Sequence, residues 1–176
     1  KPMNNYDPSV GGPRETFYMD DMYFSGAGNG EDIDTGGDIG GDTDTTVDTR
    51  VGELLTNGNF DDGSTGWSGN ARNIVDGVSI ANPQAAGNPW DVNLSGDVVL
   101  VPGADYTVVF TAQGAEGRSL IAGIGDAGAP YHNHSETLSL TDSWQTYTLH
   151  LNATDAGNGG AFTGASRVIF DMGQDV

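Results

Sequence analysis

Apolar and polar residues alternate with a period of two along several short segments of the chain. In residues 104–112, ADYTVVFTA, this places Tyr106, Val108 and Phe110 on one side and threonines on the other. Residues 144–151, WQTYTLHL, and 166–172, SRVIFDM, alternate in the same way. A period of two is that of a β-strand with one buried face, so each segment is predicted to be such a strand.

Helices are not expected. No segment of useful length repeats its apolar residues every 3.6 positions, and the 28 glycines of the chain would be costly inside helices. Short alternating segments separated by Gly and Asn turns are typical of two packed sheets. The pattern therefore predicts an all-β fold of the β-sandwich type.

The chain divides into three parts by composition. Residues 14–24, RETFYMDDMYF, are aromatic and strand-like, and they close a first part, 1–24. Residues 25–52 consist largely of Gly, Asp and Thr, which predicts an extended, solvated linker. Its D-x-D-x-G spacing also suits loose calcium binding, although the twelve-residue loop ending in Glu is missing. The remaining part, 53–176, contains the alternating segments.

The charge of the chain narrows the choice of partners. Twenty-five acidic and six basic residues give a net charge of −19, which repels phosphate backbones and anionic membrane surfaces. We therefore expect neither nucleic acid nor membrane as a partner. The excess suits a neutral ligand, a divalent cation, or simply solubility in a salty exterior. Because there is no cysteine, no disulfide framework is expected.

No catalytic constellation emerges from the sequence. We expect His132 and His134 to point to opposite sides of their strand, so that they do not ligate one metal, and His150 belongs to another segment. Neither a nucleophile elbow nor a phosphate-binding loop is present. Most acids lie in the linker or in turns, where Asp makes local hydrogen bonds. The chain is therefore predicted not to be an enzyme.

A sugar-binding function fits the residues better. A sugar presents an apolar face and an edge of hydroxyls, so its site needs exposed aromatic rings flanked by polar side chains. Trp90 and Tyr131 both adjoin turns, in GNPW and GAPY, while Asn93, Gln145 and Asp171 lie on predicted strands. Each polar residue taken alone is also compatible with an ordinary solvated sheet face.

Five phrases resemble, in order and spacing, the family 4 carbohydrate-binding modules: ELLTNGNFDDGSTGWSG, NPWDVNL, VPGADYTVVFTAQ, SWQTYTLHL and SRVIFDMG. The resemblance covers residues 53–176. It implies a jelly-roll β-sandwich with a concave glycan-binding sheet, of the kind appended to secreted glycan-degrading enzymes. It also implies that Trp67 and Tyr106 are core residues. Trp144 stays ambiguous, and Trp90 is assigned equally to the face of Val92 and Leu94 or to the cleft rim.

The resemblance and the strand pattern together give a set of candidate ligand-binding residues. Tyr131 and Trp90 would stack on the sugar, and the remaining candidates would hydrogen-bond its hydroxyls or form the rim. These remaining candidates are Asn93, Asp171, Gln145, His132, His134, Asn70 and Arg72.

The resemblance also implies a structural calcium ion. Asp61, in NGNFD, matches one ligand of the family, whereas the matching acid of a last strand is missing before Val176. The segment TFYMDDMYF has the look of that last strand, which is explained most simply if it ends a preceding module of a tandem pair. We therefore expect this segment to fill the open sheet edge beside the strand of Phe170, within the chain or by exchange with a neighbour. Asp20 would then join Asp61 at the calcium.

The sequence thus predicts a non-catalytic module that binds soluble β-glucan, with β-1,3-glucan such as laminarin preferred because NPWDV resembles modules of laminarinases. Such a module would direct an attached glycoside hydrolase to its substrate, in a secreted or cell-surface protein of a bacterium, with a salty marine exterior suiting its charge. Xylan, mixed-linkage glucan and amorphous cellulose stay open as ligands. The alternative is a calcium-stabilised structural or adhesion domain of a secreted multidomain protein.

Overall fold

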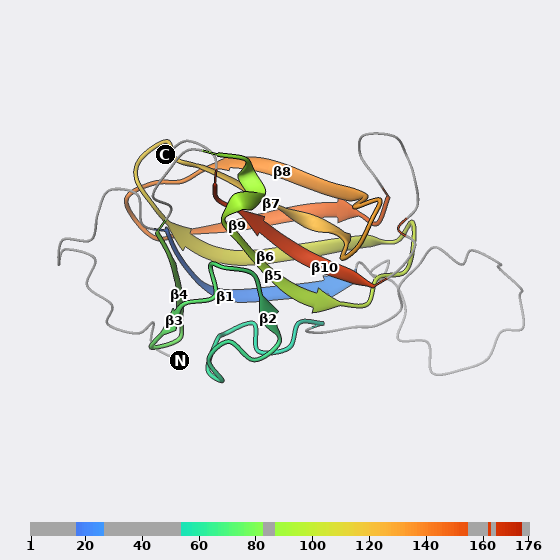
Figure 1. The fold of residues 1–176 in the computed structure, drawn as a ribbon, viewed down its shortest axis with the longest axis horizontal. Helices are drawn as coiled ribbons and strands as arrows, with labels where there is room; N and C mark the ends of the chain where they lie inside the picture. The colour runs from blue at the N-terminus through green and yellow to red at the C-terminus, as the bar shows by residue number, and fades with distance from the viewer. Residues whose placement is uncertain (1–16, 27–53, 83–86, 155–161, 163–164, 174–176) are drawn as a thin grey trace, which may run out of the picture.

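The protein is a β-sandwich. The computed structural model describes residues 17–26, 54–82, 87–154, 162 and 165–173, and within them ten strands form two five-stranded antiparallel sheets (Figure 1). The all-β sandwich predicted from the alternation is confirmed. Among the described residues, no helix is long and apolar enough to cross a membrane.

We call the two layers sheet A and sheet B. Sheet A has the order β3 (Ile74–Val75), β4 (Val78–Ala81), β1 (Phe17–Gly26), β6 (Asp105–Gln113) and β9 (Gln145–Asn152). Sheet B has the order β2 (Trp67–Ser68), β5 (Asn93–Val98), β10 (Ser166–Asp171), β7 (Ser119–Asp126) and β8 (Asn133–Ser139). In Figure 1, β10 and β5 of sheet B lie in front of β1 and β6 of sheet A.

The core lies between the sheets and follows the sequence alternation. Val108 and Phe110 of β6 are fully buried, as is Phe170 of β10. The rings of Phe110 and Phe170 meet edge to face with centroids 4.9 Å apart, so they join the two layers directly. Trp67 and Tyr106 are 4% and 1% exposed, which places both in the core as expected.

Strand β1 lies in the interior of sheet A. It pairs with β4 on one side and β6 on the other, and a bulge interrupts its pairing with β6 between Asp20 and Tyr23. Phe17, Met19 and Phe24 are at most 1% exposed, and the Phe24 ring stacks on Tyr106 with centroids 5.2 Å apart. This strand therefore supplies a central part of the core.

The place of β1 differs from the expectation. It was expected to fill an edge beside the strand of Phe170, but that strand, β10, is flanked by β5 and β7. The physical reason is that β1 contributes inward-facing apolar side chains, which face sheet B across the core. Residues 1–16 and 27–53, and with them most of the predicted linker, lie outside the described residues.

Candidate functional site

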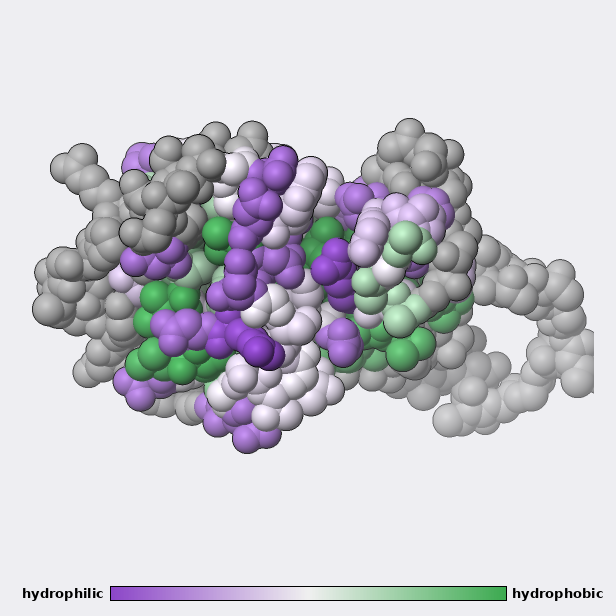
Figure 2. Space-filling model, in the orientation of Figure 1, coloured by the Kyte–Doolittle hydropathy of each residue, from purple (hydrophilic) through white to green (hydrophobic). Residues whose placement is uncertain are grey.

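A cleft of about 490 Å³ opens on the outward face of sheet B. Its floor is built by alternation along β10, because Val168 and Phe170 turn into the core while Arg167, Ile169 and Asp171 turn outward. Ile121 and Gly125 of β7 and Asn133 and Ser135 of β8 continue the lining. In the space-filling view from the same side as Figure 1, hydrophilic residues occupy the middle of the molecule, with hydrophobic residues beside them (Figure 2).

Two exposed aromatic side chains line this cleft. Trp90 is 64% exposed and Tyr131 is 57% exposed, and they come from different loops. A single exposed aromatic ring is common on a protein surface, but two large exposed rings at one cleft form an apolar patch of the kind that marks an interaction site. Their presence at one cleft therefore marks it as the candidate binding site.

Trp90 stands on a single 3-10 turn, η1 (Pro89–Asp91), which precedes β5. The Asp91 carboxylate accepts the backbone N–H of Asn88 at 2.8 Å, and the Gly173 N–H donates to the Pro89 carbonyl at 2.8 Å. These bonds tie the turn to the end of β10. The exposure of Trp90 and its place in the cleft lining decide between its two assignments in favour of the cleft rim, because Leu94 is fully buried in the core.

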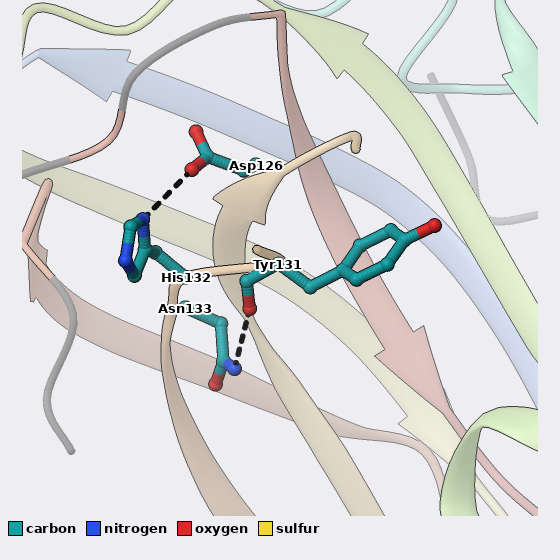
Figure 3. A network of polar contacts seen from close by, with 4 residues as sticks. All are labelled: Asp126, Tyr131, His132 and Asn133. Carbon is teal, nitrogen blue, oxygen red and sulfur yellow. Dashed lines mark hydrogen bonds and ion pairs between the residues drawn. The ribbon is translucent and has the colours of Figure 1, made fainter. Parts of the chain in front are cut away.

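Tyr131 stands on the loop between β7 and β8. Its φ is 59°, and the preceding Ala129–Pro130 peptide bond is cis. The Tyr131 N–H donates to the Gly128 carbonyl at 2.8 Å, which forms a tight turn. In Figure 3 the Tyr131 ring extends away from the neighbouring His132.

Polar side chains of β5 and β10 form a connected row on sheet B, in which Asp171 and Arg167 line the cleft while Asn93 and Ser95 lie beside it. The Asn93 amide donates to the Asp171 carboxylate, and the Ser95 hydroxyl donates to the Asn93 amide oxygen at 2.6 Å. The Arg167 guanidinium reaches the Ser95 hydroxyl at 3.4 Å. Asn93 and Asp171 are direct partners in the β5–β10 ladder, which explains why the structure brings these two predicted residues together.

Burial in the cleft floor raises the pKa of the Asp171 carboxyl above its ordinary value. The hydrogen bond from Asn93 and the positive charge of Arg167 oppose this rise by stabilising the carboxylate. A half-buried carboxylate that accepts an amide hydrogen bond and feels a positive charge nearby is well suited to accept hydrogen bonds from sugar hydroxyls.

The predicted rim residues Asn70 and Arg72 are not part of the cleft lining. The Asn70 amide donates to the Asp91 carbonyl at 2.7 Å and accepts the Asn93 N–H at 2.9 Å, so it braces the start of β5. Gly69, just before it, has φ 97°, and a Cβ there would lie 2.1 Å from the Asn93 carbonyl oxygen. Only glycine allows this approach. Arg72 is exposed and does not line the cleft.

The structure places Gln145 away from the cleft, because β9 belongs to sheet A, where Gln145 pairs with Ala112. Its amide donates to the Ser143 hydroxyl at 3.3 Å. Gln145 therefore does not share a face with Asn93 and Asp171, as a glycan-contacting role would require. Trp144, beside it, lies near Tyr18 with ring centroids 6.5 Å apart, so it covers part of sheet A.

The two neighbouring histidines do point different ways, but not because of strand alternation. Residues two apart in a strand share a face; His132 differs from His134 because it precedes the start of β8. His132 lines the cleft and pairs with Asp126, whereas the His134 Nδ1 lies 3.1 Å from the backbone nitrogen of Asn152. His134 is thus engaged with β9 and does not line the cleft.

Asp20 and Asp61, the two predicted calcium ligands, lie on segments that are joined by a backbone hydrogen bond. The Met22 N–H in the β1 bulge donates to the Gly58 carbonyl at 2.9 Å, which brings the strand of Asp20 against the loop that leads to Asp61. The Asp61 carboxylate accepts a hydrogen bond from the Asn59 amide at 2.8 Å. No group of three or more His, Asp or Glu residues in the described part of the chain could hold a metal ion. A calcium ion would therefore depend on amide and carbonyl oxygens as well, which calcium accepts.

Sequence reasoning missed several lining residues, above all Arg167, Asp126 and Ile169. Arg167 was identifiable in principle, since it lies four residues before Asp171 and shares its face. Asp126 gave no such signal, because its pairing with His132 depends on the path of the loop between them.

Taken together, fold and cleft define a ligand-binding β-sandwich module. A comparison with family models matches the carbohydrate binding domain family CBM_4_9 over residues 52–163. A solved structure described as "CBM4 structure and function" matches with 25% sequence identity and a TM-score of 0.44, over 57% of this chain and 63% of that chain. The chain thus spans less than two thirds of that structure. No curated protein matches the chain.

The chain belongs to this family and is a non-catalytic carbohydrate-binding module. Membership in a carbohydrate-binding family implies a polysaccharide partner.

Proposed function

We propose that the module binds a soluble β-glucan chain in the cleft on sheet B, with β-1,3-glucan such as laminarin as the preferred ligand. The observation that carries the proposal is the placement of Trp90 and Tyr131, both exposed, at one cleft that Asp171 and Arg167 also line. Asn93 holds Asp171 by a hydrogen bond from beside the cleft. Aromatic rings stack on the C–H face of a sugar, and the polar row meets its hydroxyls.

Charge supports a neutral glycan. The net charge of −19 opposes an anionic polysaccharide at long range. Within the cleft, the Asp171 and Asp126 carboxylates face the single guanidinium of Arg167 among the lining residues. The preference for β-1,3 linkage rests on the resemblance of NPWDV to modules of laminarinases.

Affinity electrophoresis tests this proposal. Native gels containing laminarin, xylan or hydroxyethylcellulose are run with the wild-type protein, with Tyr131→Ala and with Tyr23→Ala. Tyr23 is 41% exposed on sheet A and is therefore a matched control outside the cleft. We expect equal retardation by laminarin for the wild type and Tyr23→Ala, and clearly weaker retardation for Tyr131→Ala. Stronger retardation by another polysaccharide would overturn the linkage preference, and no retardation in any gel would contradict the β-glucan proposal.

We propose that the parent protein is a glycoside hydrolase acting outside the cell, which the module holds on its substrate. The membership of the chain in a carbohydrate-binding family supports this role.

A structural calcium ion near Asp61 and Asp20 is also part of the proposal. Its support is the contact of the β1 bulge with the loop ending at Asp61. If calcium binds the folded state alone, its removal lowers the melting temperature. Thermal melts with and without EDTA measure this, and an unchanged melting temperature would count against calcium.

The alternative function, a calcium-stabilised adhesion domain, predicts the calcium effect together with no retardation in any polysaccharide gel.

Strand exchange through β1 is the last element of the proposal. A neighbouring copy that supplied β1 would make the same contacts as β1 makes within its own chain, so exchange adds little cost. Sedimentation at rising protein concentration tests it, with a dimer expected at high concentration and a monomer throughout counting against it.

A further inference from the structure

Tyr131 adopts a backbone conformation that tyrosine rarely takes. Its φ of 59° lies in the left-handed region, where Cβ crowds the following carbonyl oxygen. The side chain is also 57% exposed, so burial in the core does not hold the residue in place. A strained residue persists only where its surroundings over-determine it, and such residues concentrate at ligand sites.

The surroundings that hold Tyr131 are the two ends of its loop. The Asp126 N–H donates to the His132 carbonyl at 2.8 Å, which closes the loop at the base. The Ala127 N–H donates to the Ala165 carbonyl at 2.7 Å, which anchors the loop beside the start of β10. Both bonds fix the backbone on either side of Tyr131.

A side-chain pair adds a second closure at the same base. The His132 Nδ1 lies 3.1 Å from the Asp126 carboxylate, and the Asp126 side chain is only 3% exposed (Figure 3). Asp126 is the last residue of β7, so the sheet fixes its position, and His132 directly follows Tyr131. Figure 3 shows His132 turned toward Asp126 and the Tyr131 ring extending in another direction.

We propose that the Asp126–His132 pair is a lock that holds Tyr131 in its strained conformation, so that the ring is already oriented to stack on a sugar. This inference rests on the proposed glycan-binding function and deepens it. Ordering the loop before binding removes part of the cost of association. His132 is then a positioning residue that acts through Tyr131, instead of the hydroxyl donor that the sequence suggested.

A double-mutant cycle tests the lock. Binding of laminarihexaose is measured by calorimetry for the wild type, His132→Ala, Tyr131→Ala and the double variant. We expect His132→Ala to weaken binding by about fivefold in the wild type, as the loss of loop order predicts, and by less than about twofold when Tyr131 is already alanine. Asp126→Asn retains an acceptor oxygen for His132 and is expected to stay within about twofold of the wild type.

Two outcomes would overturn the lock. If His132→Ala lowers the affinity for laminarihexaose equally in the wild type and in Tyr131→Ala, His132 contacts the sugar itself. If it lowers the affinity in neither, His132 does not position Tyr131. Melting curves establish that each variant is folded, and His132→Leu replaces His132→Ala if the latter does not fold.

A measurement without ligand separates this inference from the function on which it rests. ¹⁵N relaxation of the Tyr131 amide is expected to show a lower order parameter in His132→Ala than in the wild type. An unchanged order parameter contradicts the lock, whether or not any glycan binds. Failure of wild-type protein to bind laminarihexaose contradicts the function and leaves the relaxation result to decide the lock.

The backbone strain at Tyr131 can also be tested through the melting temperature. Glycine adopts φ near 59° without strain, so Tyr131→Gly is expected to raise the melting temperature while weakening glycan binding. A lowered melting temperature would show that Tyr131 is not held against its preference.

Discussion

The outward faces of the two sheets have the same alternation in the sequence but differ in how their side chains are used. On sheet A, Thr107 and Thr111 of β6 stand opposite His150 and Thr146 of β9. The Thr107 hydroxyl lies 3.2 Å from the His150 Nδ1, in a contact between two directly paired residues. On sheet B, the polar side chains connect into one row, and two of its members, Asp171 and Arg167, line a cleft together with two exposed aromatic rings.

This difference shows what makes a polar sheet face a binding face. Single polar residues on a solvated face need no functional explanation. On a binding face, the polar side chains are ordered by hydrogen bonds to one another. Such a face also carries exposed aromatic rings on which a ligand can stack. Sheet B meets both conditions in the described part of the chain, because η1 and the β7–β8 loop bring Trp90 and Tyr131 to the same cleft.

The largest expected effect comes from removing both rings. Trp90→Ala combined with Tyr131→Ala should weaken laminarin binding by about thirtyfold, from two stacking contacts of on the order of 1 kcal/mol each. Tyr23→Ala on sheet A should leave the affinity unchanged. Calorimetry with laminarin measures both, and a comparable loss from the Tyr23 variant would abolish the distinction between the faces.

A smaller effect is expected from the guanidinium of the floor. Arg167→Met keeps the apolar stem and removes the charged donors, so glycan affinity should fall by about tenfold, the value of one charge-assisted hydrogen bond. Arg72→Met is the matched control, because Arg72 does not line the cleft. If Arg72→Met lost as much affinity as Arg167→Met, the cleft would be placed wrongly.

Asp171→Asn should change the pH dependence of the free energy of unfolding and should also lower the glycan affinity. Because burial raises the pKa of Asp171 in the folded state, its contribution to stability is present below the unfolded value, near 3.8, and is lost as pH rises through the folded value. We therefore expect the free energy of unfolding of Asp171→Asn, relative to the wild type, to increase between pH 4 and pH 7, with glycan affinity reduced a few-fold. Urea titrations across this range measure the trend, and the opposite slope would contradict it.

Much of the fold was predictable because burial imposes a period of two on every strand that covers the core. Val108, Phe110 and Phe170 show it plainly, and all three are fully buried. The position of β1 was not predictable in the same way. Its composition identified a strand, but pairing partners far away in sequence decide whether a strand lies at an edge or inside a sheet.

The candidate site was predictable only in part. The turn positions of Trp90 and Tyr131 and the shared face of Asn93 and Asp171 follow from local sequence, and the structure brings these four residues to one region. Gln145 has the same local features but belongs to sheet A, which no local pattern reveals. The pairing of Asp126 with His132 depends on loop geometry and was equally inaccessible.

The central claim is that the outward face of sheet B, and not that of sheet A, binds β-glucan. Titration of ¹⁵N-labelled protein with laminarihexaose, followed by amide chemical shifts, compares the two faces in one experiment. We expect perturbations concentrated on β5, β10, η1 and the β7–β8 loop, with β6 and β9 unaffected. Perturbations concentrated on β6 and β9, or none at saturating oligosaccharide, would contradict it.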